Sequence, residues 1–320
     1  MGTDSDIGQG DIGQGMASIA GALIAALPAE QRDAALFPFD GPVRTQWTYL
    51  PGPRPGLQLL GLNGSARKAA HRLLASALSR HAFAQAVTIM AMEEVLDIDE
   101  DGRRGRHSAD YRVAVFGTPG GDAWAWRFEG HHLSVSATIM GDAVVVAPVF
   151  LGVNPARVEH QGRLVVGAVW PEEDLARSLI SELGPEARKE AIISETAPSD
   201  IVTGSSVAVS GPLAPPGVSG ARLDGPARDL LDRLLRFYLE RLTPALAARE
   251  LARIDVADAS FGWAGGLRAG EGHYYRIQAP GLLIEYDNTQ RGANHAHSVL
   301  RLPGEDFGAT HLARENSTRA

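Results

Sequence analysis

The sequence contains no cysteine. This absence excludes disulfides, thiolate metal sites and iron–sulfur clusters, and it removes any thiol nucleophile. Any metal must therefore be held by nitrogen and oxygen ligands. The sequence also lacks the Gly-x-Ser-x-Gly elbow of the serine hydrolases and the spacing of a phosphate-binding P-loop.

Long apolar runs and basic clusters are absent as well. The one apolar run near the N-terminus, residues 19–27, is shorter than the roughly 20 residues of a membrane helix, and no Lys or Arg precedes it as in a secretory signal. Lys and Arg number 30 against 38 Asp and Glu, which gives a net charge of −8 without a basic stripe. We therefore expect a cytoplasmic protein with neither membrane nor nucleic-acid partners.

The composition predicts one large globular domain. With 320 residues, of which 44% are hydrophobic, the chain can bury a full core. Residues 1–15 contain a tandem Asp-Ile-Gly-Gln-Gly repeat and predict a disordered tail, and residues 311–320 a frayed end. The domain then spans residues 16–310. A loop rich in Ser, Gly and Pro, residues 194–220, is the one candidate for an internal boundary.

Hydrophobic periodicity predicts an α+β fold, in which helices pack on an antiparallel sheet. Helices are expected at residues 17–27, 30–36, 65–78, 83–96, 172–183 and 226–242. A four-stranded meander is expected at residues 112–116, 124–128, 133–140 and 143–149, and later strands at 274–278, 282–287 and 297–302. We expect the final hairpin to join the earlier meander.

A histidine pair, His131 and His132, ends one predicted strand. Adjacent strand residues point to opposite faces, so only one of the two should reach a given site unless Gly130 permits a bulge. Which one does so is left open. The alternative is one exposed histidine and one histidine bonded within the fold.

A second cluster lies near the C-terminus. If their segment is extended, His295 and His297 project from the same face about 6 to 7 Å apart. Glu285 and Asp287 have the same alternate spacing on the preceding strand. Two imidazoles with one carboxylate suit non-heme iron and also catalytic zinc. The alternative is a polar hairpin whose side chains bond the backbone of a turn.

Three further residues are candidates for binding a substrate. Arg127 and Arg276 flank the two histidine-bearing regions, where they could hold a carboxylate, and Asn294 precedes His295. A structural ion pair is the alternative for each arginine.

Several segments together resemble the bacterial domain-of-unknown-function family 3500 (DUF3500), over residues 19–307. They are Gly130-His131-His132-Leu133-Ser134, Tyr275-Arg276-Ile277-Gln278, Glu285-Tyr286-Asp287-Asn288-Thr289-Gln290, Ala293-Asn294-His295, His297-Ser298-Val299 and Asp306-Phe307-Gly308. The chain departs from the family pattern at Leu300 and Leu302, where Trp and Asp are common. The resemblance implies where the site lies and no particular reaction.

These observations lead to a hypothesis of a metal-dependent enzyme acting on a small organic molecule. One divalent ion, iron or zinc, is held by His295, His297 and a carboxylate, Glu285 or Asp287. His131 or His132 serves as a fourth ligand or as a proton shuttle, so that Glu285 is the expected ligand and His131, His132 and Asp287 are the candidate catalytic groups. Oxygenase chemistry is preferred over hydrolysis because two histidines and one acid suit iron. The alternatives are a non-catalytic protein that binds a metal or small molecule, and purely structural clusters. The oligomeric state is left open.

Overall fold

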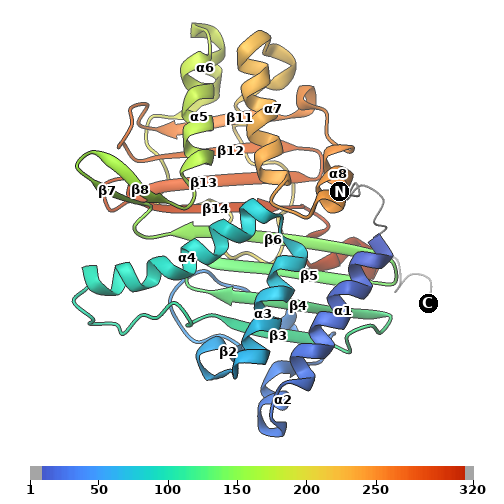
Figure 1. Ribbon diagram of the computed structural model, residues 1–320. Coiled ribbons are helices and arrows are strands. Elements are labelled where there is room, and N and C mark those ends of the chain that lie inside the picture. The colour runs from blue at the N-terminus through green and yellow to red at the C-terminus, as the bar shows by residue number, and fades with distance from the viewer. Residues whose placement is uncertain (1–8, 314–320) are drawn as a thin grey trace, which may run out of the picture.

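The chain folds around one large, mostly antiparallel sheet (Figure 1). The structure is a computed structural model and describes residues 9–313. Its strands are β1 Leu36–Phe37, β2 Leu57–Gln58, β3 Arg112–Gly117, β4 Ala123–Gly130, β5 Leu133–Met140, β6 Ala143–Val153, β9 Ile192–Ser194, β10 Val218–Ser219, β11 Ser260–Gly265, β12 His273–Ala279, β13 Leu282–Gln290 and β14 His295–Arg301. Their order is β1-β3-β4-β5-β6-β14-β13-β12-β11-β10, with β2 on β3 and β9 on β11. A separate hairpin joins β7 Arg157–His160 to β8 Arg163–Gly167.

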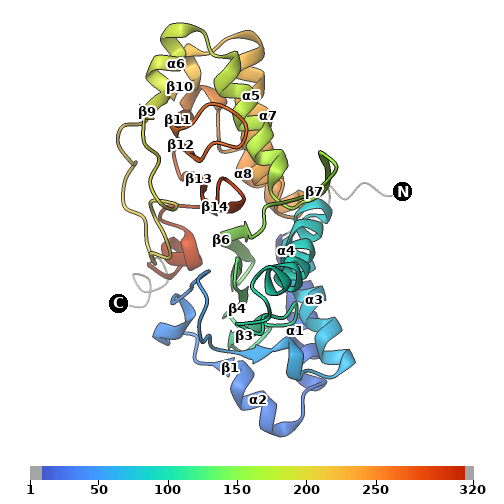
Figure 2. The same cartoon turned by 90° about the vertical axis from the view of Figure 1, so that its left-hand side faces the viewer.

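Helices cover one face of the sheet, and long loops cover the other (Figure 2). The helices are α1 Gln9–Ala25, α2 Ala29–Ala35, α3 Gly64–Ala77, α4 Arg80–Asp99, α5 Trp170–Glu182, α6 Pro185–Ala191, α7 Gly225–Leu239 and α8 Pro244–Leu251. Short 3-10 turns are η2 Pro42–Arg44, η3 Leu59–Gly61, η4 Gly220–Arg222, η5 Val256–Asp258 and η6 Asp306–Gly308. No helix within residues 9–313 is both long and apolar enough to cross a bilayer.

The α+β prediction is confirmed, including the way the two ends of the chain meet. The meander β3-β4-β5-β6 has the predicted order, and β14 pairs antiparallel with β6, so that Leu300 lies opposite Val149. The helix α7 buries Leu231, Leu234 and Leu239 on one side, as its three-and-four spacing predicts. The strand β11 and the hairpin β7-β8 were not predicted.

The predicted tail at residues 1–15 needs correction. Residues 1–8 lie outside the described residues, but α1 begins at Gln9. A Cβ added at Gly13 would lie 3.3 Å from Ile139, and Met16 is fully buried. The glycines that suggested disorder therefore let this helix approach the sheet closely. At the other end, residues 311–313 are helical, and residues 314–320 lie outside the described residues.

The two halves of the chain repeat the same order of elements. The first half runs α1-α2-β1-β2-η3-α3-α4-β3-β4-β5-β6, and the second half runs α5-α6-β9-β10-η4-α7-α8-β11-β12-β13-β14. Within residues 9–313, the turns η2, η5 and η6 and the hairpin β7-β8 have no counterpart in the other half. In both halves the short strands pair alike, because β1 and β9 run parallel to β3 and β11, whereas β2 and β10 run antiparallel to them.

An approximate two-fold axis relates these halves. The corresponding strands β6 and β14 pair antiparallel along the seam between the two meanders. The loops α3–α4 and α7–α8 also bond each other. The N–H of Ser79 donates to the carbonyl of Arg241, and the N–H of Thr243 donates to the carbonyl of Ala77. Reciprocal bonds between equivalent segments are the pattern of a two-fold contact.

Candidate metal centre

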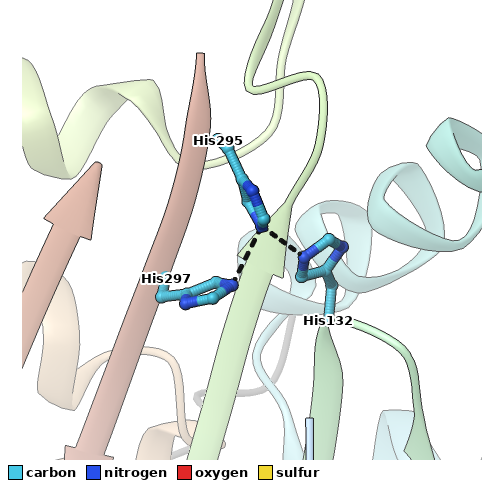
Figure 3. Close-up of side chains that lie close together, drawn as sticks. All are labelled: His132, His295 and His297. Atoms are coloured by element: carbon cyan, nitrogen blue, oxygen red, sulfur yellow. Dashed lines mark hydrogen bonds between the residues drawn. The ribbon is translucent and has the colours of Figure 1, made fainter. Parts of the chain in front are cut away.

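Three histidines from distant parts of the chain meet at one end of the seam (Figure 3). The Nε2 atom of His295 lies 2.7 Å from Nε2 of His132 and 3.0 Å from Nε2 of His297. His132 and His297 are buried, and His295 is partly exposed. The predicted meeting of histidines from the middle and the end of the chain is thus present in the structure.

A tight turn delivers His132 to the cluster. Residues 131 and 132 connect β4 to β5, with Gly130 paired to Leu133, and His132 has a left-handed φ of 63°. Gly130 is required here because an added Cβ would lie 2.2 Å from the ring of Tyr111. Since the two histidines occupy a turn rather than a strand, their rings lie on the same side, with centroids 3.6 Å apart.

Strand alternation delivers the other two imidazoles. His295 and His297 are alternate residues of β14 and share one face of the sheet, as predicted. The backbone of β6 leaves room for the second ring, because a Cβ at Gly152 would lie 3.0 Å from Cδ2 of His297. Gly152 also donates its N–H to the carbonyl of His132 at 2.7 Å, which ties the turn to the seam.

Carboxylates lie on the far side of two of the rings. Nδ1 of His297 lies 2.7 Å from Oδ1 of Asp200, whose other oxygen accepts from the Tyr49 hydroxyl at 3.0 Å. Burial alone would raise the pKa of Asp200, but the bond to His297 and the charge of that ring hold it below the ordinary value. Nδ1 of His132 lies 3.6 Å from Oε1 of Glu93 and has no hydrogen-bond partner in the structure.

These carboxylates determine which nitrogen carries the proton. A neutral ring that donates from Nδ1 to a carboxylate has a lone pair on Nε2. Asp200 imposes this tautomer on His297, and Glu93 favours it for His132. Both Nε2 lone pairs then face Nε2 of His295, which has at most one proton to donate. Hydrogen bonds among the three rings therefore cannot use both lone pairs. A cation between the rings would accept both of them.

The electrostatic surroundings favour the neutral form of His132 and His295. Burial, followed by the charge of His297, lowers the pKa of His295 to about 3. Burial also lowers the pKa of His132 well below its ordinary value, with neighbouring histidines adding to the effect. Neutral imidazole is the form that binds a metal.

The residues fit a divalent ion bound by nitrogen. The ligand atoms of His132, His295 and His297 lie within 4.8 Å of one another. Bonds of about 2.0–2.1 Å from three imidazoles to zinc place the nitrogens roughly 3.3 Å apart, so the rings need to separate by only a few tenths of an ångström. Carboxylates on the outer nitrogens are the usual support of such ligands.

His131 does not join the three convergent rings. Its Nδ1 lies 2.6 Å from Oε1 of Glu93 and 3.0 Å from a guanidinium nitrogen of Arg106. Glu93, His131 and His132 also form a second possible ligand group, which shares His132 with the first. The structure thus answers the open question of the pair, since His132 faces the cluster and His131 lies beside it.

Glu285, the predicted carboxylate ligand, does not reach the histidines. Its carboxylate accepts bonds from Val202 N at 2.6 Å, from the N–H and hydroxyl of Thr203, and from the Tyr274 hydroxyl at 2.9 Å. It is fully buried and fixes residues 202–203 to the sheet. In place of this carboxylate, the third group at the site is the imidazole of His132.

Asp287 lies opposite His297 on the neighbouring strand, outside the ligand group. One of its oxygens accepts from the N–H and hydroxyl of Thr289, whereas the buried Oδ2 has no hydrogen-bond partner among the residues that the structure describes. Burial raises the pKa of Asp287 to about 6, and the charge of Asp200 adds to the rise. Asp287 therefore belongs to the wall behind the site.

The three predicted substrate-binding residues all have internal partners. Arg127 forms a 2.8 Å ion pair with Glu129, and Arg276 donates to the carbonyl of Pro215. Asn294 accepts from the N–H of Arg157 at 2.7 Å. Arg127 thus forms the structural ion pair given as its alternative, whereas Arg276 bonds a backbone carbonyl instead of a carboxylate. Within residues 9–313, no contact directs any of the three side chains into the cluster.

Sequence reasoning missed the supporting residues Asp200, Glu93 and Tyr49. Asp200 lies in the loop that resembled a domain boundary, and Glu93 lies within α4, where an acid is ordinary. The only available signal was a histidine cluster that required outer carboxylates, and this requirement does not say where in the sequence to look.

Comparison with known proteins identifies a family and no further relative. A family model described as a protein of unknown function (DUF3500) matches residues 9–309, which confirms the resemblance seen in the sequence. No curated protein and no solved structure matches the chain.

Proposed function

The chain belongs to the DUF3500 family, and we propose that it is a metal-dependent enzyme whose His132, His295 and His297 hold one divalent ion. The observation that carries the proposal is the convergence of three Nε2 atoms, two of them on rings that have a carboxylate beside Nδ1: Asp200 lies 2.7 Å from His297, and Glu93 lies 3.6 Å from His132. A purely structural cluster of buried imidazoles has no reason to oppose lone pairs in this way.

The ligand set favours zinc and hydrolytic chemistry. The preference for an iron oxygenase depended on a carboxylate ligand, and Glu285 makes its bonds elsewhere. Three histidines and one open position are a ligand set of catalytic zinc. When bound, zinc would supply a water of pKa about 7, which is a nucleophile at neutral pH.

The surrounding residues support proton removal from the site. His131 lies beside His132, and its Nδ1 contacts Glu93 at 2.6 Å. It is also more exposed than its neighbour, with 14% of its side chain accessible against 2%. We assign to Glu93 and His131 the transfer of a proton from the reaction to solvent. Asp200, held by Tyr49, keeps His297 oriented.

Metal titration of untagged protein tests the proposal. Metal-free protein is titrated with Zn²⁺ and Fe²⁺ against a chromophoric chelator, and hydrolysis of small esters and amides is measured on the loaded form. One ion should bind per chain, and binding should be lost in His132→Ala, His295→Ala and His297→Ala. His160→Ala, an exposed histidine on β7, is the matched control.

Two outcomes would count against the proposal. A wild type that binds neither ion, or ligand variants that bind as tightly as the wild type, removes the metal site. A single bound ion without turnover of any substrate favours the second candidate, a non-catalytic metal-binding protein.

A further inference from the structure

A polar cavity of about 400 Å³ lies next to the three histidines. Its size is within the range of sites for small molecules. The residues that line it come from the loop before β2, from β2 and β3, from α4 and the loop after it, and from the turn between β4 and β5. The charged and titratable residues that matter below are Arg54, Glu93, Arg104, Arg106, Arg112 and His131.

His131 and Glu93 lie between the cavity and the histidine cluster. His131 lines the cavity, and its ring centroid is 3.6 Å from that of His132. Glu93 also lines the cavity and lies 3.6 Å from Nδ1 of His132. A small molecule held in the cavity is therefore close to the ligands of the proposed metal.

Guanidinium groups dominate the lining, and not all of them are neutralised. Arg106 is paired with Glu93 and Glu100, and Arg54 lies 3.4 Å from Glu129. Arg112 differs, because within residues 9–313 its guanidinium contacts only the carbonyl of Gly56, at 2.9 Å, and no carboxylate.

Two other arginines, Arg104 and Arg54, line the same cavity as Arg112. Arg104 is 62% exposed at the rim and lies 3.7 Å from Glu100. Within residues 9–313 the buried Nε atom of Arg54 has no hydrogen-bond partner, although it lies 3.4 Å from Oε1 of Glu129, and the side chain is 5% exposed. The charge of Arg112 is felt at Arg54, where it lowers the pKa of that guanidinium further after burial has lowered it.

We propose that this cavity binds an oxyanion of the substrate, a carboxylate or a phosphate, with Arg112 as its principal contact. The planar guanidinium group matches both anions through paired hydrogen bonds. The substrate class is thus a small molecule with an anionic group at one end and its reacting bond at the histidine end. The inference rests on the proposed function for the identity of the reacting end, but the anion site itself needs no metal.

Anion binding is tested first on metal-free protein and then on zinc-loaded protein. Isothermal titration with inorganic phosphate and with succinate separates the two anion chemistries, and neutral succinamide is the ligand control. We expect at least one oxyanion to bind, and Arg112→Gln to weaken it about tenfold or more, as the loss of a charge-assisted contact requires. Arg233→Gln, on an exposed turn of α7, should have no effect.

Arg104→Gln supplies a second variant if Arg112→Gln does not fold, and it should weaken the same anion by a smaller factor. The inference is overturned if neither oxyanion binds at about 10 mM, or if both variants bind as the wild type does. Chelator competition on the same samples reports the metal site separately. A wild-type protein that binds no metal refutes the proposed function. A wild-type protein that binds metal but shows no arginine-dependent anion binding refutes this inference alone.

Discussion

Replacing Asp200 by asparagine tests whether the carboxylate behind His297 supports a metal ligand. Oδ1 of Asp200 accepts from His297 Nδ1 and from the N–H of Ile201, both at 2.7 Å, and Oδ2 accepts from the Tyr49 hydroxyl at 3.0 Å. Asparagine keeps the shape and one acceptor oxygen. The Asp200→Asn substitution therefore removes the negative charge with little change in packing.

The expected effect is a weaker metal site in an intact fold. A carboxylate behind a ligating histidine contributes about 10- to 100-fold to metal affinity, which is about 1.4 to 2.7 kcal/mol. Tyr49→Phe keeps the charge of Asp200 and removes only the hydroxyl bond, so its effect should be smaller. Asp232→Asn, whose carboxylate pairs with Arg236 on the surface of α7, is the matched control.

Competition with a chromophoric zinc chelator measures the affinities, and circular dichroism checks that each variant is folded. We expect the order wild type and Asp232→Asn, then Tyr49→Phe, then Asp200→Asn, with His297→Ala weakest. If Asp200→Asn binds zinc within about threefold of the wild type while His297→Ala abolishes binding, the carboxylate does not tune the ligand and the reasoning from tautomers is refuted.

Three further predictions concern other parts of the chain. Gly152→Ala should weaken zinc binding about tenfold or more, because its Cβ would lie 2.9 Å from Phe150 and 3.0 Å from His297; equal affinity in the same competition assay would contradict this. Glu285→Gln should lower the free energy of unfolding by about 3 kcal/mol, because four hydrogen bonds converge on the buried carboxylate. Denaturant titration measures this change. A variant with unchanged stability and no metal binding would show instead that Glu285 is a metal ligand. Burial lowers the pKa of His273 to about 3. Below pH 6.5 this histidine is therefore protonated in the unfolded chain but stays neutral in the folded chain. Stability should therefore fall as the pH falls, and between pH 7 and 5 the wild type should lose about 2 kcal/mol more than His273→Phe; parallel pH curves would refute it.

Most of the fold could be predicted because the pattern of apolar residues encodes it. Four consecutive strands separated by turn residues specify the meander, and the last strands repeat that pattern. The prediction of a disordered tail was wrong for residues 9–15, because glycine can indicate either a flexible chain or a close contact. The position of Ile139 beside Gly13 shows that a close contact is the case here.

The candidate site was predicted in part for a related reason. Spacing along one strand correctly placed His295 and His297 on a common face. The third ligand could not be chosen because His131 and His132 lie in a turn, where strand alternation does not apply. Glu285 has the right spacing on its strand, but its carboxylate accepts a hydrogen bond from Thr203. The two residues are 82 positions apart in the sequence, so no local pattern reveals this contact.

The repeated order of elements gives the histidine cluster a counterpart at the opposite end of the seam. There the turn between β12 and β13 has Gly281, with a φ of 73°, in the place that His132 occupies in the first half. The first four residues of β6, Ala143 to Val146, which correspond to the histidine-bearing start of β14, include no imidazole. This molecule thus contains its own internal comparison: the same backbone frame, once with ligands and once without.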